Sequence, residues 1–433
     1  MVALIKTLQV LLALSLLILI HEAGHFLFAK LFRIRVDKFY LFFDIGGKAL
    51  LKFRKGETEY GIGWLPLGGY CKIAGMVDES LDTKSLKKDP QPWEFRSHPA
   101  WQRLLVMAGG VLFNFIFAII VYCSIMGIWG SAYISNEESE IYASELAADM
   151  GFRTGDRILS LDGYEPTDFS SLQADLARRS VRKVAVLRDG DTLDIYIDQA
   201  RMSEVLNSPL LFDLAIPFVV DSVAADGPNA GAGLLDGDRI TAFDGHAVRY
   251  LQDSREILAG MAQSEVDATV LRGGDTLSIP VSVDADGRIG VFVKTPAVKT
   301  ARYGFAEAIP AGWKLAVTTI KGYVQDLGLL IKPSTGAYKS VGSFIAIGQV
   351  FPAVWDWYRF LNILALLSIM LGVMNLLPIP ALDGGHIVIV LWEMITGRKP
   401  SEKFLVAVQY VGMILIFALM ILAFGNDIGR LIR

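Results

Sequence analysis

The segment of the sequence best suited to chemistry is His21-Glu22-Ala23-Gly24-His25, which has the pattern H-E-x-x-H. Because residues i and i+4 share one face of a helix, the imidazoles of His21 and His25 can both reach one metal ion. Zn²⁺ accepts imidazole nitrogen at about 2.0–2.1 Å. Glu22 lies beside the first ligand and can accept a proton from a water molecule that the metal activates. The segment therefore predicts a zinc-dependent hydrolytic centre with Glu22 as its general base.

The surroundings of this motif make it more informative than the pattern alone, which occurs by chance in many proteins. Between Lys6 and Lys30 lie 23 residues, and the only ionisable side chains among them are the two histidines and the glutamate. Ionisable groups inside an apolar span are costly to bury and are functional by default. A polar patch that faces a helix bundle is the alternative explanation.

Zinc needs a third protein ligand and an open position for water, and Asp383 is our candidate. It follows Pro378 and Pro380, which each remove a helix donor, and it precedes Gly384 and Gly385, which permit turning. The apolar segment is therefore expected to break as a helix here. Broken backbone at membrane depth is tolerated where it lines a wet cavity. No Lys or Arg is near in the sequence, so a metal would compensate the charge of the carboxylate.

Two alternatives stay open for this stretch. Asp383 could merely cap the helix that follows, and His386 could be the third ligand in its place. The other histidines are weaker candidates. His98 lies in a polar stretch ahead of an apolar segment, and His246 belongs to a repeat that we place on the opposite side of the membrane.

Composition indicates a membrane protein. The chain has 433 residues, of which 53% are hydrophobic and 20% charged, and its mean hydropathy is +0.43. The 41 basic and 45 acidic residues leave a net charge of −4 without a basic block, which excludes a nucleic-acid-binding protein, and the apolar content excludes disorder. Cys71 and Cys123 are the only cysteines, and we interpret both as free thiols.

Four uncharged or nearly uncharged segments are each longer than the roughly 20 residues that cross a bilayer. We predict a polytopic α-helical membrane protein with four transmembrane helices, a membrane-associated β-hairpin region and two tandem β-rich domains. The predicted boundaries are 1–32, 101–130, 356–382 and 404–426 for the four spans, 33–100 for a cytoplasmic or membrane-reentrant β-hairpin region, 131–212 and 213–298 for the two β-rich domains, 299–355 for an amphipathic helix and linker, 383–403 for a cytoplasmic loop, and 427–433 for a tail.

The distribution of positive charge predicts the orientation. Only Lys6 precedes the first span, whereas the loop after it is rich in Lys and Arg, so the positive-inside rule places residues 30–103 in the cytoplasm. Both termini and the long segment 137–355 then lie outside, and the hydrolytic centre lies near the cytoplasmic side. The basic residues that carry this assignment are Lys30, Arg33, Arg35, Lys38, Lys84, Lys87, Lys88, Arg96 and Arg103, with a smaller group at Arg398, Lys399 and Lys403.

The outer segment contains an internal repeat. Residues 151–163 read GFRTGDRILSLDG and residues 233–245 read GLLDGDRITAFDG, so the shared pattern recurs after 82 residues. Each copy indicates a turn, a Gly-Asp pair, a strand and a tight Asp-Gly turn. The pattern resembles the PDZ domain, and a generic pair of β-rich domains is the alternative. PDZ folds bind extended peptides by adding a strand to a sheet edge.

Three further segments have a structural and a functional interpretation. Residues 34–75 alternate apolar and polar residues, which predicts β-hairpins at the membrane interface whose free edge could bind an unwound substrate or merely shield the metal. Residues 305–327 predict an amphipathic helix that lies on the outer leaflet or packs between domains. Gly110 and Asn114 share a helix face, either for helix packing or along a substrate path.

These motifs together resemble the site-2 protease family of zinc intramembrane metalloproteases. The resemblance rests on H-E-x-x-H in the first span, on N-x-x-P-x-P-x-L-D-G from Asn375 onward, on PDZ-like repeats between them, on Pro66-Leu-Gly-Gly-Tyr70 and on Gly110-x-x-x-Asn114. It covers essentially the whole chain and is closest to bacterial members with tandem periplasmic PDZ domains. One departure is Met370, where the family pattern leads us to expect an Asn.

The resemblance implies roles for single residues. His21, His25 and Asp383 would hold Zn²⁺ and Glu22 would be the general base. Asn375 would help to hold the substrate, and Gly68, Gly69 and Asn114 are our further substrate-binding candidates. The implied substrates are single-span proteins of the bacterial inner membrane, notably an anti-sigma factor already trimmed by another protease, and remnant signal peptides. This activity is regulated intramembrane proteolysis in an envelope stress response, with membrane lipid and no nucleic acid as partner.

Two functions of other classes are weighed against a protease. A metal transporter could use intramembrane histidine and carboxylate groups, but tandem PDZ repeats and the absence of a repeated set of metal-binding spans argue against it. A PDZ scaffold without catalysis is the other alternative. The complete set of His, Glu, His and Asp argues against that function.

Overall fold

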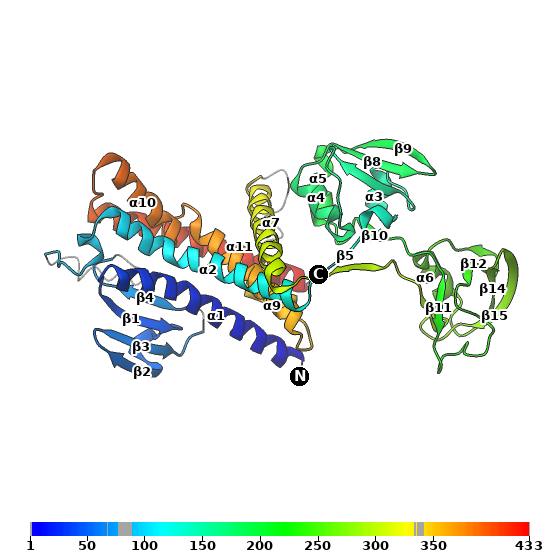
Figure 1. The fold of residues 1–433 in the computed structure, drawn as a ribbon, viewed down its shortest axis with the longest axis horizontal. Coiled ribbons are helices and arrows are strands. Elements are labelled where there is room, and N and C mark those ends of the chain that lie inside the picture. The colour runs from blue at the N-terminus through cyan, green and yellow to red at the C-terminus, as the bar shows by residue number, and fades with distance from the viewer. Residues whose placement is uncertain (1, 67, 77–88, 333–334, 336–341, 433) are drawn as a thin grey trace. The chain divides into compact units, whose positions relative to one another are not determined.

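The computed structural model divides the chain into two compact units, which are described separately (Figure 1). It describes all residues except 1, 67, 77–88, 333–334, 336–341 and 433, so Leu67, Lys84, Lys87 and Lys88 lie outside the described residues. The helical unit comprises Met1–Gly130, Arg302–Ile331 and Tyr338–Arg433. The β-rich unit comprises Ser131–Ala301 and Lys332–Ala337.

The helical unit contains, among its described residues, four helices that are long and apolar enough to cross a membrane, as predicted. Helix α2 lies in the middle of the unit and packs against α1, α7, α9 and α10. Of its most apolar 18-residue window 44% is buried, against 17% for α1 and 11% for α11, whose large apolar side chains face outward as lipid-facing helices require. These helices are α1 (Val2–Leu31), α2 (Ala100–Ile128), α9 (Trp357–Leu376) and α11 (Glu402–Ile432).

Helices α1 and α2 touch backbone to backbone at a pair of glycines. A Cβ atom on Gly24 would collide with the carbonyl of Gly109, and one on Gly109 would lie 2.6 Å from the carbonyl oxygen of Gly24. Small residues at such a crossing let helices approach closely, which matters in lipid because apolar side chains gain little by leaving it. The contact places α2 directly beside the turn of α1 that carries the histidines.

The segment 383–403, predicted to be a cytoplasmic loop, instead contains the helix α10 (Asp383–Thr396). The prediction was wrong because Ile387, Val390 and Met394 continue an apolar pattern at helical spacing beyond the Gly-Gly pair. Helix α10 packs against α2 and α9 and ends at Gly397, which has a left-handed φ of 68°. The predicted break between spans is present, since α9 ends at Leu376 just before the prolines.

The region after α1 forms a four-stranded sheet in the order β2-β3-β1-β4. The expected hairpin exists between β2 and β3, whereas β1 and β3 pair in parallel, which a series of hairpins does not predict. Strand β4 pairs antiparallel with β1, and both strands lie against α1 (Figure 1). The strands are β1 (Val36–Leu41), β2 (Ala49–Lys55), β3 (Thr58–Gly63) and β4 (Tyr70–Ile73).

The predicted amphipathic helix is α7 (Phe305–Ile331), and its buried side is made mainly of small residues. Its small residues Ala308, Gly312 and Ala316 face inward, and a Cβ on Gly312 would lie 2.5 Å from backbone atoms of Cys123 on α2. The bulky stripe is largely exposed, with Phe305 at 90%. Small residues allow close helix packing, so α7 packs on α2 through its small side and leaves its bulky apolar side chains exposed. The exposed stripe residues are Phe305, Ile309, Trp313 and Val324.

The β-rich unit contains two lobes with the same strand order. In the first lobe β7, β8 and β9 form one sheet, and the first strand β6 pairs with the last strand β10. In the second lobe β12, β14 and β15 correspond to them, and β11 pairs with β16. The strands are β6 (Ile141–Ala143), β7 (Arg157–Leu161), β8 (Lys183–Arg188), β9 (Asp191–Tyr196), β10 (Phe212–Leu214), β11 (Val220–Val223), β12 (Arg239–Phe243), β13 (His246–Ala247), β14 (Glu265–Arg272), β15 (Asp275–Ser282) and β16 (Val291–Val293).

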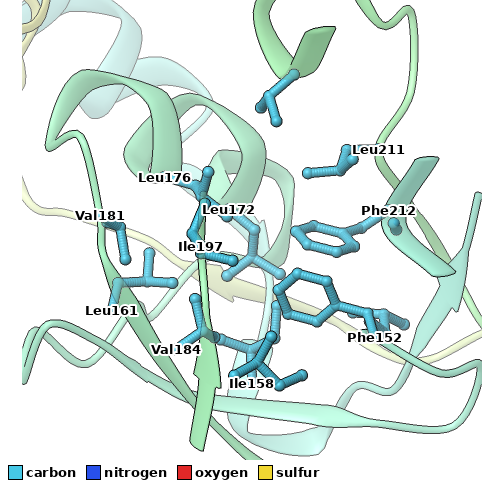
Figure 2. Close-up of a cluster of buried hydrophobic side chains, with 14 of the residues drawn as sticks. Phe152, Ile158, Leu161, Leu172, Leu176, Val181, Val184, Ile197, Leu211 and Phe212 are labelled. Carbon is cyan, nitrogen blue, oxygen red and sulfur yellow. The ribbon is translucent and has the colours of Figure 1, made fainter. Parts of the chain in front are cut away.

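Each lobe has its own apolar core. In the first lobe, Phe152 and Phe212 meet edge to face at 4.9 Å between ring centroids, between helix α4 (Leu172–Arg178) and the sheet (Figure 2). In the second lobe, Phe218 and Phe243 are in contact beside helix α6 (Leu251–Gly260). Strands β5 (Ser131–Ile134) and β17 (Val298–Ala301) pair at the two ends of this part of the chain.

The repeated Gly-Asp pair has the same structural function in both lobes. The carboxylate of Asp156 accepts two hydrogen bonds from Arg188 and one from the amide of Arg153. The carboxylate of Asp238 accepts two from Arg272 and one from the amide of Leu235, each at 2.7 Å. Such two-pronged Arg–carboxylate pairs are strong and directional. Both lobes need this Asp–Arg pair, which explains why the Gly-Asp motif occurs twice in the sequence.

We predict that Asp238 makes the second lobe less stable in acid. Hydrogen bonds from Arg272 lower the pKa of Asp238, so its stabilising effect is present above about pH 4 and is lost as the pH falls through the lower folded-state pKa. Asp238→Asn should therefore cost about 1–3 kcal/mol at pH 7 and progressively less as the pH falls below about 4. Hydrogen exchange of the β12 amides in the full-length protein measures this, with the exposed Asp236→Asn as control. A cost that does not decrease below about pH 4 would contradict the assignment.

Candidate active site

Two imidazoles of α1 and one carboxylate of α10 converge in the helical unit. His21 Nε2 lies 3.2 Å and His25 Nε2 lies 3.4 Å from Asp383 Oδ2, and the two Nε2 atoms are 3.2 Å apart. Among the described residues this is the group of three His, Cys, Asp or Glu side chains whose ligand atoms lie close enough for one metal. Asp383 follows His21 by 362 residues in the sequence, and α10 brings it back beside α1 by packing along α2.

The hydrogen bonds of the two rings turn their Nε2 atoms toward the cluster. His25 Nδ1 lies 2.8 Å from the backbone oxygen of Val106, so Nδ1 carries the proton and Nε2 has a free lone pair. His21 Nδ1 lies 3.1 Å from the side-chain amide of Asn114, whose Oδ1 has no hydrogen-bond partner among the residues that the structure describes. Exchanging the amide oxygen and nitrogen, which have nearly the same shape, lets His21 Nδ1 donate to Oδ1.

The cluster fits a divalent cation. Asp383 Oδ2 is buried and has no hydrogen-bond donor in the described part of the chain, although two nitrogen lone pairs point at it. Three lone pairs facing one another repel unless a proton or a cation lies between them. Two imidazoles and one carboxylate are a ligand set that zinc takes in catalytic sites, where the fourth position stays open.

Gly110 of α2 is what lets the rings come together. A Cβ atom at this position would lie 2.5 Å from His25 Nε2 and 2.6 Å from His21 Cε1, and both rings are held by other contacts. The same helix supplies Val106 and Asn114 to the two Nδ1 atoms. Helix α2 is thus the surface against which both rings are oriented.

The backbone between α9 and α10 aims Asp383 at the rings. Ala381 has a left-handed φ of 74°, which costs a residue with a Cβ of order 1–3 kcal/mol and persists only when its surroundings hold it there. Leu382 is the N-cap residue of α10 and Asp383 is the first residue of the helix. Asp383 is therefore not the capping residue, which removes the alternative that it merely caps α10. Gly384 and Gly385 pack so closely on the backbone of Leu377 and Ile379 that a Cβ would not fit.

The other predicted residues are distributed around the cluster. The Nδ2 atom of Asn375 lies 3.4 Å from His21 Nε2. Asn114 is fully buried behind His21 and orients its ring, while its role in substrate binding stays a prediction. His386 contributes no atom to the ligand group, His98 bonds to the backbone of Glu94, and His246 is exposed in the β-rich unit.

Strand β4 and the glycines before it lie beside α1. A Cβ on Gly69 would lie 2.6 Å from Ile18, one turn before His21, and one on Gly68 would lie 2.6 Å from the ring of Phe43. Burial, together with the negative charge of Glu22, raises the pKa of the Cys71 thiol on β4. The chain therefore enters β4 beside the turn of α1 that comes just before the H-E-x-x-H motif. Both cysteines are free, as predicted.

Two contributors to the cluster were not predicted. The backbone oxygen of Val106 orients His25, and Gly110 orients both rings, although we had assigned the glycine to helix packing or to a substrate path. A backbone carbonyl leaves no signal in a sequence. The glycine did, through its spacing from Asn114, but the surface that it contacts is set by the crossing of two helices.

Comparison with known proteins identifies the family. A model of peptidase family M50 matches residues 9–419. The chain belongs to peptidase family M50. The regulator of sigma-E protease RseP of Escherichia coli is 31% identical over 450 residues, covering 97% of each chain, and that of Salmonella typhimurium is 31% identical over 452 residues. A Neisseria meningitidis protein whose name describes it as a zinc metalloprotease is 27% identical, over 97% of this chain and 98% of its own.

The family membership confirms the predicted resemblance to the site-2 proteases and makes this chain a zinc-dependent intramembrane metalloprotease. Zinc is its metal, and its four apolar helices make it a membrane protein. These statements concern the class of enzyme, whereas the roles of single residues are proposed below.

We predict that Gly110→Ala abolishes high-affinity zinc binding. The added methyl group must push at least one imidazole away, because its nearest neighbours are ring atoms at 2.5–2.8 Å. Zinc content of the purified protein measures the effect. The control is Gly127→Ala on the same helix, where the nearest neighbour of the new methyl group is Ala308 Cβ at an ordinary 3.5 Å. Normal zinc content in the Gly110 variant would contradict the proposed packing.

Proposed function

We propose that this M50 protein is an endopeptidase that cuts transmembrane segments of single-span proteins, with His21, His25 and Asp383 as zinc ligands and Glu22 as general base. The observation that carries the proposal is the convergence of two Nε2 atoms and one carboxylate oxygen at 3.2–3.4 Å. Three protein ligands would leave a bound zinc ion a fourth position for water, and this, together with the adjacent glutamate, is what peptide hydrolysis requires.

The division of labour follows from the geometry. Bound zinc supplies a Lewis acid that polarises the scissile carbonyl and acidifies water. Glu22 is not one of the three residues of the cluster and is half-buried next to His21, so its carboxylate is free to take the proton of the attacking water and to deliver it to the leaving amine. Val106 and Asn114 keep the ring protons on the Nδ1 atoms, away from the reacting groups. No covalent intermediate is proposed.

A substrate helix must be unwound before it can be cut, because its carbonyl groups are otherwise engaged in its own hydrogen bonds. We propose that the edge of β4 and the preceding Gly68 and Gly69 hold the extended segment by strand addition. The support is that β4 is a terminal strand of its sheet and lies against α1 beside the motif. Asn375 of α9, whose Nδ2 lies 3.4 Å from His21 Nε2, would also hold the segment.

We propose that the two lobes are tandem PDZ domains in the periplasm that exclude substrates with bulky outer domains. The support is the shared strand order and the repeated Asp–Arg pair. The relatives named regulator of sigma-E protease make a trimmed anti-sigma factor the first substrate to test, in an envelope stress response, with remnant signal peptides as the second. The proposed location is the bacterial inner membrane with both termini in the periplasm and the site near the cytoplasmic face.

We predict that Glu22→Gln retains zinc and loses cleavage. Gln keeps the size of the side chain but cannot accept the proton, and a positioned general base contributes about 10²–10⁴-fold. Cleavage of a one-span reporter in detergent, with zinc content measured on the same sample, tests this. Glu57→Gln, at an exposed turn, is the control. Full activity in the Glu22 variant would refute the general base.

We predict that Asp383→Ala lowers bound zinc, because it removes one of three ligands, whereas His386→Ala leaves zinc content unchanged. Both residues lie in the first turn of α10, so the pair controls for disturbance of the helix. Metal analysis of both purified variants measures the effect. The opposite result, with zinc retained without Asp383 and lost without His386, would transfer the third ligand to the histidine.

A further inference from the structure

A buried ion pair joins α10 to α2 at a distance from the cluster. Arg103 Nη2 of α2 lies 2.5 Å from Glu393 Oε1 of α10, and each residue is only 8% exposed. Arg103 also donates from Nε to the backbone oxygen of His98 at 3.0 Å, and its guanidinium lies 5.9 Å from the ring of Phe95. These two contacts orient the Arg103 guanidinium toward Glu393.

The pair and the proposed metal site lie at the two ends of one helix contact. Arg103 precedes Gly110 by seven residues on α2, and Glu393 follows Asp383 by ten residues on α10. At a rise of 1.5 Å per residue these separations are about 10 and about 15 Å, along two helices that must run antiparallel. A shift of α10 along α2 would therefore move Asp383 and Glu393 together.

Apolar packing alone resists a shift of α10 along α2 only weakly. Its buried residues are Gly384, Gly385, Val390 and Glu393, while Val388, Leu391, Trp392, Met394 and Ile395 are exposed. In lipid, such exposed apolar side chains gain little from packing against another helix. Glu393 is thus the only buried residue of α10 whose side chain makes a directional contact with α2 among the contacts described.

We propose that the Arg103–Glu393 ion pair positions α10 along α2 and so aims the Asp383 carboxylate at His21 and His25. Arg103 and Glu393 are positioning residues, since neither contacts the cluster. This inference rests on the proposed role of Asp383 as a zinc ligand.

The test uses the double variant Arg103→Met/Glu393→Met in the full-length protein. Replacing both members of a buried ion pair by apolar residues is often neutral or stabilising, whereas removing one leaves an uncompensated charge. If the pair only stabilised the fold, the double variant would bind zinc normally. If it positions Asp383, zinc affinity should fall at least about tenfold, which is the lower end of the effect of losing a direct hydrogen-bond partner of a metal ligand. The absorption spectrum of the Co²⁺-substituted protein should change with it.

Two further variants keep the result interpretable. Arg103→Lys retains the positive charge but loses the planar guanidinium with its fixed donor geometry, so it should weaken zinc binding less than the double variant does. This variant replaces the double variant in the test if the double variant does not fold. Arg359→Met removes the exposed ion pair of Arg359 with Asp356 on α9 and should change nothing.

The outcomes separate this inference from the proposed function. Normal zinc affinity and an unchanged Co²⁺ spectrum in a folded double variant, or in Arg103→Lys if only that variant folds, would overturn the positioning role. Asp383→Ala is measured in parallel. Loss of zinc there with normal binding in the ion-pair variants would reject only the present inference, whereas retained zinc there would reject the ligand assignment itself.

Discussion

A carboxylate and two imidazoles that face one another inside an apolar helical unit repel unless a cation lies between them, and the fold around them is arranged to hold this group together. Asp383 Oδ2 has two nitrogen lone pairs as neighbours at 3.2 and 3.4 Å and, within the described residues, no hydrogen-bond donor. In a low-dielectric setting such a group is costly without a metal. The ligands must also be held apart from water by helices that fit closely.

Close fit explains the glycines of the helical unit. Gly24 and Gly109 let α1 and α2 touch, Gly110 leaves room for the rings, and Gly384 and Gly385 let α10 begin directly against the broken backbone before it. A methyl group at any of these positions would occupy space that a ring or a carbonyl holds. In lipid this kind of packing replaces the hydrophobic effect as the source of helix association.

The β-rich unit is stabilised differently from the helical unit, because each of its lobes has an apolar core of the kind found in water-soluble domains. Each has an apolar core and one buried aspartate that accepts a pair of hydrogen bonds from an arginine two strands later. The repeat in the sequence therefore records a structural requirement of each lobe. Its value for function lies in the proposed selection of substrates, which does not depend on the chemistry at the zinc.

The sequence by itself determined the elements whose signals are local. Four long apolar runs predicted four helices, the H-E-x-x-H spacing placed two histidines on one helix face, and the prolines after Asn375 ended α9. The spacing of Gly-Asp and Asp-Gly pairs predicted two similar β-rich segments. These predictions succeeded because hydropathy, helix period and proline geometry depend only on a few neighbouring residues.

Tertiary structure decided everything that depends on which surfaces meet. It placed Asp383 rather than His386 beside the histidines, turned Asn114 toward His21, formed α10 from a segment expected to be a loop, and paired β1 with β3 in parallel. The reason is that α2 crosses α1 and runs along α10, so residues hundreds of positions apart share one contact. No local pattern in the chain encodes the angle or the register of those crossings.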